Sequence, residues 1–161
     1  MITFSIEKVR DVIHELFPLW ELHWKETEMY RDGQGFNPNV ERYIKYNDVD
    51  YYILYTAREG GKLVGNFGVY LSICMHTQKL IATEDTLFLV PEYRKGLNAV
   101  HFVRFVEKDL ISRGVTEMSI SVKSPEVGKF CEFLGYKQVA HQYSKQVEDK
   151  YHVCIQSSIA A

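Results

Sequence analysis

Three strand-like runs follow one another in the middle of the chain, and the connections between them are too short to hold a helix. The runs are dense in β-branched, aromatic and aliphatic residues and cover residues 51–57, 63–75 and 80–90. Glu59-Gly60-Gly61-Lys62 is typical of a tight hairpin turn, and residues 76–79 form the second connection. Strands joined this closely run antiparallel. The sequence therefore predicts an antiparallel meander, in which Gly65 and Gly68 mark points where the middle strand can bulge.

Before the meander, the sequence predicts a short strand and then helices. Residues 2–4 are strand-like, and Ser5 is a candidate cap for a first helix, because a serine hydroxyl can accept a free N–H of the first turn. Apolar residues then recur at helical spacing, at Ile6, Val9, Ile13 and Leu16. Pro18 either begins a second helical segment that ends near residue 29 or kinks the first, since proline is unfavourable inside a helix. Asn37-Pro38 predicts another helix start, with the helix ending near residue 46.

After the meander, helices and strands alternate. An apolar face predicts a helix over residues 99–110 that Gly114 ends. A short strand over residues 118–122 and a helix that begins at Ser124-Pro125-Glu126 and stops at Gly135 come next, and residues 136–147 and 150–157 resemble a closing hairpin. This order predicts an α/β fold of the α+β kind, a mixed but mostly antiparallel sheet of about six to seven strands flanked by about four helices. No repeat or linker interrupts the chain, so residues 1–161 are interpreted as one domain.

Composition and charge narrow the range of functions. The net charge is −2, the basic residues are scattered, and no apolar stretch approaches the ~20 residues that a membrane span needs. We therefore expect neither nucleic acid nor a membrane as a partner. The N-terminus has no signal-peptide layout, and the three cysteines form no C-x-x-C or Cys/His cluster, so we expect a cytoplasmic protein with reduced thiols and without a metal site.

The junction between the third strand of the meander and the following helix has the properties of an anion site. Arg94, Lys95 and Gly96 stand in the turn that leads into the helix. The first N–H groups of a helix have no partner within it, and the helix dipole adds partial positive charge there. Two basic side chains and a glycine that permits close backbone approach complete a turn suited to a pyrophosphate.

Two segments resemble the GNAT superfamily of acetyl-CoA-dependent N-acetyltransferases. Val90-Pro91-Glu92-Tyr93-Arg94 resembles the start of its acetyl-CoA-binding motif, where a strand ending in V-x-P precedes an R/Q-x-x-G-x-G/A turn and a long helix. Phe130-Cys131-Glu132-Phe133-Leu134-Gly135-Tyr136 is similar to the family's aromatic-rich helix end, which closes on Leu-Gly and then Phe or Tyr. The order and spacing of the two segments also fit, and the resemblance covers about residues 51–147. It implies a GNAT-like acyl-CoA N-acyltransferase fold with acetyl-CoA as co-substrate.

The resemblance also implies where the co-substrate lies. Acetyl-CoA is expected between the strands over residues 81–90 and 118–122, with its pantetheine arm on the main chain of Phe88 and Val90 and its pyrophosphate on the turn. The residues expected to contact it are Phe88, Leu89, Val90, Arg94, Lys95, Gly96, Leu97, Asn98 and Ala99.

The glycines of the turn can be aligned with the family motif in two ways. Without a gap from Arg94, Leu97 falls at the first glycine and Ala99 at the last position. A turn shorter by one residue places Gly96 and Asn98 at the two glycines. We prefer the shorter turn, because Gly96 allows close approach to phosphate and Asn tolerates left-handed backbone better than other non-glycine residues.

Glu84 is the candidate general base. Period-two alternation places Glu84 on the same side of the strand as Phe88 and Val90, and Asp85 on the opposite side. Some family members carry a catalytic glutamate at the matching strand position. Burial on an apolar strand would raise the pKa of the carboxyl toward a value useful for a base. Glu84 is therefore expected to accept the proton or to position a water that does.

The general acid is less well defined. Many family members carry a tyrosine one residue after the position of Phe130, and this chain has Cys131 there. A thiol with a pKa near ~8.5 can donate a proton to the departing thiolate, but a buried cysteine more often serves packing. Tyr136 and Tyr143 are the alternatives that the sequence leaves open.

The resulting hypothesis is an N-acetyltransferase that transfers the acetyl group directly from acetyl-CoA to a primary amine of a small molecule or protein. The alternative is a catalytically degenerate GNAT-like binding or structural module, suggested by the missing tyrosine and the irregular turn. In the family that this chain resembles, the region of Trp20 and Trp24 and the loop over residues 32–36 border the acceptor, and homodimers are common.

Overall fold

The meander forms the centre of a five-stranded sheet in the computed structural model, which describes residues 1–28 and 35–145. The strands lie in chain order, namely β1 (Ile2–Ile6), β2 (Tyr52–Glu59), β3 (Lys62–Ile73), β4 (Leu80–Leu89) and β5 (Glu117–Ser119). Neighbours from β1 to β4 are antiparallel, and β5 is parallel to β4. The hairpin between β2 and β3 turns at Gly60 and Gly61, whose φ angles of 56° and 84° are those that glycine adopts without strain. The mixed, mostly antiparallel sheet is thus confirmed.

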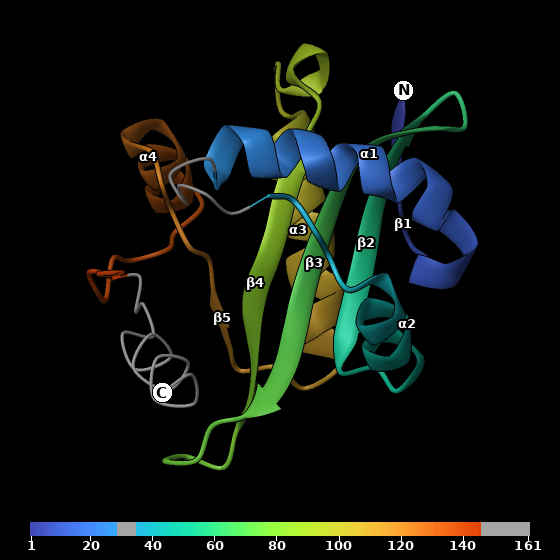
Figure 1. The fold of residues 1–161 in the computed structure, drawn as a ribbon. Helices are drawn as coiled ribbons and strands as arrows, with labels where there is room; N and C mark the ends of the chain where they lie inside the picture. The colour runs from blue at the N-terminus through green and yellow to red at the C-terminus, as the bar shows by residue number, and fades with distance from the viewer. Residues whose placement is uncertain (29–34, 146–161) are drawn as a thin grey trace, which may run out of the picture. The chain divides into compact units, whose positions relative to one another are not determined.

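Helices cover both faces of this sheet (Figure 1). Helices α1 (Val9–Thr27) and α2 (Val40–Asp48) lie on one face, and α3 (Asn98–Ser112) lies on the other. On the α1 side, Leu16 and Trp20 pack in one buried cluster with Tyr52. On the α3 side, Phe102 contacts Phe67 with ring centroids 6.2 Å apart.

The N-terminal helices differ from the sequence predictions in their starts. Ser5 lies in β1 and pairs its hydroxyl with Thr56 (3.0 Å), so it does not cap α1, which begins at Val9. Helix α1 continues through Pro18, because its buried apolar face outweighs the one hydrogen bond that proline removes. Helix α2 begins at Val40 rather than at Pro38.

The start of α2 is fixed by an asparagine cap. The Asn39 side chain accepts from the Arg42 amide (3.0 Å), which satisfies a free N–H of the first turn.

The chain divides into a unit of residues 1–128 and a unit that begins at residue 129, and helix α4 (Pro125–Phe133) spans the division. The Val127 amide donates to the Ser124 hydroxyl (3.3 Å), as expected for the start of this helix, and Gly135 follows its end with φ 97°. No strand occurs in residues 136–145, so this half of the predicted closing hairpin is wrong, and its other half lies outside the described residues. The described sheet accordingly has five strands where six to seven were expected.

The described helices were also compared with the requirements of a membrane-spanning helix. None of the helices in residues 1–28 and 35–145 combines the length and apolar character that crossing a membrane requires.

Candidate active site

Strands β4 and β5 pair over a short stretch and then separate. Only Ile81, Ala82 and Thr83 of β4 have partners in β5, and Figure 1 shows the two strands diverging beyond them. From Glu84 onward, the edge of β4 that faces away from β3 has no strand partner among the described residues. An open strand edge presents main-chain N–H and C=O groups to any extended ligand that lies along it.

We call the place where β4 and β5 separate the fork. A β-bulge next to the fork determines to which face of the sheet Glu84 and Asp85 point. Gly68 of β3 pairs with Thr86 and the next residue, Val69, pairs with Glu84, so Asp85 is an extra residue in β4. Glu84 therefore lies on the face of Val69, which is the face covered by α3, while Phe88 lies on the face covered by α1. The sequence predicted Glu84 and Phe88 on the same side of the strand. This prediction is wrong, because the extra residue at the bulge shifts the alternation of side chains by one position.

Glu84 spans the fork itself. Its Oε2 accepts from the Ser121 amide (3.1 Å), in the segment that follows β5. Burial raises the pKa of Glu84 to about 7, the Ser121 hydrogen bond opposes the rise, and the charge of Asp85 adds to it. A carboxyl with this pKa can exchange protons near neutral pH, as expected for a base.

Asp85 is a residue that the sequence analysis did not select. It points to the α1–α2 side, where its Oδ2 accepts from the Tyr43 hydroxyl (3.0 Å). Burial raises the pKa of Asp85 to about 6, against hydrogen bonds from the hydroxyls of Tyr43 and Tyr52, which lower it. The available signal was Gly68, which the sequence marked as a bulge point and which lies opposite this bulge.

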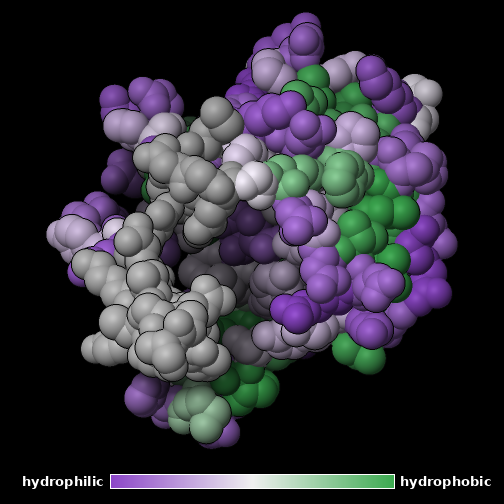
Figure 2. All heavy atoms as spheres, in the orientation of Figure 1, coloured by the Kyte–Doolittle hydropathy of each residue, from purple (hydrophilic) through white to green (hydrophobic). Residues whose placement is uncertain are grey.

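Tyrosine rings surround Asp85. Ring centroids of Tyr43 and Tyr52 lie 5.1 Å apart, and Tyr70 lies 5.1 Å from Tyr52. Asp85 itself is only partly buried. In Figure 2 this face of the molecule carries both hydrophilic and hydrophobic residues.

The turn between β4 and α3 has an anion-binding geometry. A 3-10 turn over Pro91–Tyr93 leads to Gly96, whose φ of 63° is left-handed, and α3 begins at Asn98. Lys95, Gly96 and Leu97 are exposed, and a side chain added at Gly96 would meet no atom within 4 Å. This supports Gly96 as the glycine of the shorter alignment.

Asn98 does not have the left-handed backbone that the shorter alignment suggested. It is the first helical residue and not a left-handed one, and its side-chain amide donates to the Tyr93 carbonyl (3.0 Å). Ala99 follows in the first turn of α3.

Arg94 is already engaged within the protein. Its two terminal nitrogens each donate to a carboxylate oxygen of Glu26 in α1 (2.7 Å), its Nε donates to the Leu89 carbonyl (2.6 Å), and its guanidinium lies 5.2 Å from the ring centre of Phe88. This hydrogen bonding by Arg94 lowers the pKa of Glu26. The guanidinium thus joins the end of α1 to β4 beside the anion-binding turn.

Main-chain bonding in β4 corrects one further expectation. The Val90 amide donates to the Val64 carbonyl (2.9 Å) and is not available to a ligand. Hydrogen bonding alternates along an antiparallel strand, so Phe88 turns its polar groups toward β3, as Val90 does. The main-chain N–H and C=O groups of Leu87 and Leu89 instead face the open edge of β4. The hydrogen bond from Arg94 to the Leu89 carbonyl agrees with this direction.

The other candidate residues take different positions. Cys131 is buried in the second unit, with 6% of its surface exposed, which favours a packing role. Tyr143 is 92% exposed. Trp20 belongs to the buried core beneath α1, whereas Trp24 is partly exposed and contacts Phe36, at the end of the expected acceptor loop (6.2 Å between ring centroids). Residues 32–34 of that loop lie outside the described residues.

Comparison with solved structures shows the fold. An aminoglycoside acetyltransferase from an uncultured soil metagenomic sample matches with a TM-score of 0.73 and 15% identity, over 92% of this chain and 99% of that one. The ribosomal-protein-alanine N-acetyltransferase of Brucella melitensis biovar Abortus 2308 matches with a TM-score of 0.72 and 17% identity, again over 92% and 99%. The chain has the GNAT fold. A third match, AAC(6')-Iy in complex with a CoA bisubstrate analogue, has a TM-score of 0.69 and 15% identity, over 92% of this chain and 99% of that one.

No family model and no curated protein matches the sequence. At identities this low, the structural similarity shows the fold alone. An inference about function therefore has to rest on the site residues of this chain.

Proposed function

We propose that this protein is an N-acetyltransferase that moves an acetyl group from acetyl-CoA directly to a primary amine. The observation that carries this proposal is the fork between β4 and β5, which has a free strand edge, an anion-binding turn at its upper end and two partly buried carboxylates at its apex. The structures with the same fold include acetyltransferases whose acceptors differ, so the fold alone does not define the acceptor.

The co-substrate would lie along the open edge of β4. Main-chain groups of Leu87 and Leu89 face that edge and can bond the amides of a pantetheine arm, in place of Phe88 and Val90. The pyrophosphate would be bound by the exposed Lys95, by the Gly96 turn and by the free N–H groups that begin α3.

Arg94 has to change partners in this proposal. Its Nε occupies the Leu89 carbonyl, and Glu26 neutralises its charge. A pyrophosphate beside the turn competes with Glu26 for the guanidinium, because both offer paired oxygens to the same two nitrogens. Release of Arg94 also frees the Leu89 carbonyl, so phosphate binding and pantetheine binding favour each other.

The chemistry requires a proton acceptor and a leaving thiolate. One of the two carboxylates, Glu84 or Asp85, removes a proton from the acceptor ammonium, the amine nitrogen attacks the thioester carbonyl, and the carbon–sulfur bond breaks. The CoA thiolate then takes up the second proton that the nitrogen releases, and the products are the amide and free CoA. Holding both reactants at the fork makes the attack effectively intramolecular, and the step uses no acyl-cysteine at the buried Cys131.

Calorimetric titration with acetyl-CoA tests the proposal. We expect saturable binding to the wild-type protein, weaker binding to Gly96→Val, whose side chain is incompatible with a φ of 63°, and tighter binding to Glu26→Gln, which releases Arg94. The opposite signs of these two effects separate a specific site from general destabilisation. Absence of binding at millimolar acetyl-CoA would refute the proposal, and binding without acetylation of any amine would favour the degenerate module.

A further inference from the structure

Simple strand alternation would place the adjacent carboxylates of Glu84 and Asp85 on opposite faces of the sheet. The bulge in β4 also places them on opposite faces, but it exchanges the face of each one. Glu84 is turned to the fork, where the Ser121 amide holds it. Asp85 is turned to the side of the sheet covered by α1 and α2, where the Tyr43 hydroxyl holds it. The two side chains therefore have different surroundings and can have different tasks.

We propose that Asp85, within the wall formed by Tyr43, Tyr52 and Tyr70, binds the ammonium group of the acceptor, and that the acceptor is a compact cationic primary amine with an apolar body. This inference rests on the proposed function and names the substrate class of the same site.

The charges around Asp85 favour a cationic ligand. The ionisable groups that face Asp85 are Tyr43 from α2, Tyr52 from β2, Tyr70 from β3 and Glu84 from β4. None of these is a cation, so within the described residues no positive side chain compensates this partly buried carboxylate. An uncompensated carboxylate is costly in such a position, and an ammonium group supplies the missing charge.

The tyrosine rings beside Asp85 favour a cationic ligand that also has an apolar part. Tyr43 and Tyr70 are partly exposed, with ring centroids 6.5 Å apart and an interplanar angle of 27°. Faces of tyrosine rings attract cations and also cover apolar groups. A carboxylate between such rings therefore selects an amine that carries positive charge on an apolar body.

The hydroxyl of Tyr52 is a second phenol group beside Asp85. Tyr52 is fully buried, and hydrogen bonding by its hydroxyl lowers the pKa of Asp85. The Tyr52 hydroxyl lies above Gly68, where an added Cβ would be 1.9 Å away, and Gly68 pairs with Thr86, the residue after Asp85. The bulge thus places Asp85 beside the hydroxyls of both Tyr43 and Tyr52, which favour its carboxylate form.

The same arrangement excludes acidic acceptors. Asp85 and Glu84 are adjacent, and each raises the electrostatic cost of a further negative charge near the amine. A phosphate or carboxylate next to the acceptor nitrogen would therefore be repelled. In the reaction, Asp85 takes the first ammonium proton, and the freed nitrogen bonds to the acetyl carbon. The carbon–sulfur bond breaks with its electron pair on sulfur, and the departing CoA thiolate takes up the second proton that the nitrogen releases.

The test compares Asp85→Asn with a matched control, Asp11→Asn, an exposed aspartate in the first turn of α1. Acetyl-CoA binding is measured first by calorimetry, and we expect the same affinity within twofold for wild type and both variants. Phenethylamine, which is cationic and apolar, and glucosamine 6-phosphate, which carries an anion, are then compared as acceptors through release of the CoA thiol. Binding of phenethylamine to the CoA-loaded protein is titrated in parallel.

We expect wild type to bind and acetylate phenethylamine and to reject glucosamine 6-phosphate, and Asp85→Asn to lose at least 100-fold in kcat/KM without a loss of acetyl-CoA affinity. The rise of kcat/KM with pH near 6 should also disappear in Asp85→Asn, a change that a merely structural role would not produce. Failure of phenethylamine to bind the loaded wild type, or full activity in Asp85→Asn, would overturn the inference while acetyl-CoA binding still supported the proposed function. Failure of acetyl-CoA to bind would refute the proposed function instead.

Discussion

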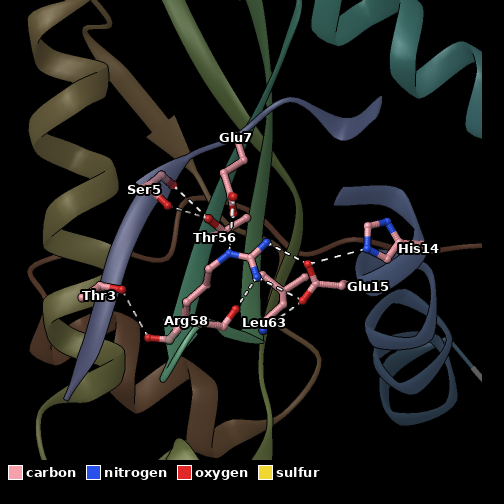
Figure 3. A network of polar contacts seen from close by, with 9 residues as sticks. Thr3, Ser5, Glu7, His14, Glu15, Thr56, Arg58 and Leu63 are labelled. Atoms are coloured by element: carbon pink, nitrogen blue, oxygen red, sulfur yellow. Dashed lines mark hydrogen bonds and ion pairs between the residues drawn. The ribbon is translucent and has the colours of Figure 1, made fainter. Parts of the chain in front are cut away.

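Replacing Arg58 by alanine should destabilise the protein far more than replacing an exposed arginine. Figure 3 shows Arg58 in β2 between Glu7, which follows β1, and Glu15 in α1. Its Nε donates to Glu7 (3.0 Å), both terminal nitrogens donate to Glu15 (3.0 Å each), and Nη1 also reaches the Gly61 carbonyl (2.7 Å). One guanidinium thus fixes α1 against the strands on which the candidate site is built.

The magnitude follows from the burial of this network. Breaking a fully buried ion pair costs roughly 3–5 kcal/mol, whereas an exposed pair contributes about 0–1 kcal/mol. The side chains of Arg58, Glu7 and Glu15 are 17%, 25% and 32% exposed, which lies between the two limits. We therefore expect Arg58→Ala to lower the free energy of unfolding by about 2–3 kcal/mol in urea denaturation at pH 7, since two carboxylates lose their cation.

The control is Arg10→Ala, which removes an ion pair to Asp48 whose side chains are 53% and 38% exposed, and which should cost no more than about 0.5 kcal/mol. Acid provides a second check. The hydrogen bond from Arg58 lowers the pKa of Glu15 in the folded state, so this stabilisation is present above the unfolded pKa and is lost as the pH falls through the folded pKa. Equal losses for Arg58→Ala and Arg10→Ala, or a loss for Arg58→Ala that is unchanged at pH 3, would refute the reasoning.

Three further predictions concern the sheet and its turn. Gly68→Ala should destabilise by about 3 kcal/mol in urea denaturation, because the new Cβ would lie 1.9 Å from the hydroxyl of the fully buried Tyr52; a cost below 1 kcal/mol would mean that the ring can move aside. Gly96→Ala should cost only about 1 kcal/mol, since its Cβ meets nothing and only the φ of 63° is strained, yet it should weaken acetyl-CoA binding in calorimetry; unchanged affinity would argue against a phosphate at this turn. Glu84→Gln should raise the melting temperature at pH 8. The folded-state pKa of Glu84 is raised to about 7, so the wild-type protein loses stability as the pH rises from about 4.5 to 7, by roughly 3 kcal/mol at most. The variant lacks this carboxyl and should therefore show a flatter profile of melting temperature against pH.

Local chemistry explains which predictions from the sequence were confirmed. The Gly60-Gly61 hairpin, the glycine turn before α3 and the end of α3 at Gly114 depend on backbone angles that one or two residues decide. The length and pattern of the three central strands likewise predicted the antiparallel meander. The GNAT fold and the position of the glycine turn before α3 could therefore be predicted from the chain itself.

Tertiary structure decided the features that depend on partners far away in sequence. The face on which Glu84 and Asp85 lie depends on how β4 pairs with β3, and one extra residue in β4 reverses the alternation that the sequence predicts. Arg94 is paired with Glu26, 68 residues away, because the end of α1 is packed beside β4. Local propensity ends or kinks a helix at Pro18, yet α1 continues, since burial of its apolar face against the sheet is a larger free-energy term than the lost hydrogen bond. The sequence thus determined the type of fold and the glycine turn before α3, whereas the sheet register and helix packing decided on which face of the sheet Glu84 and Asp85 lie.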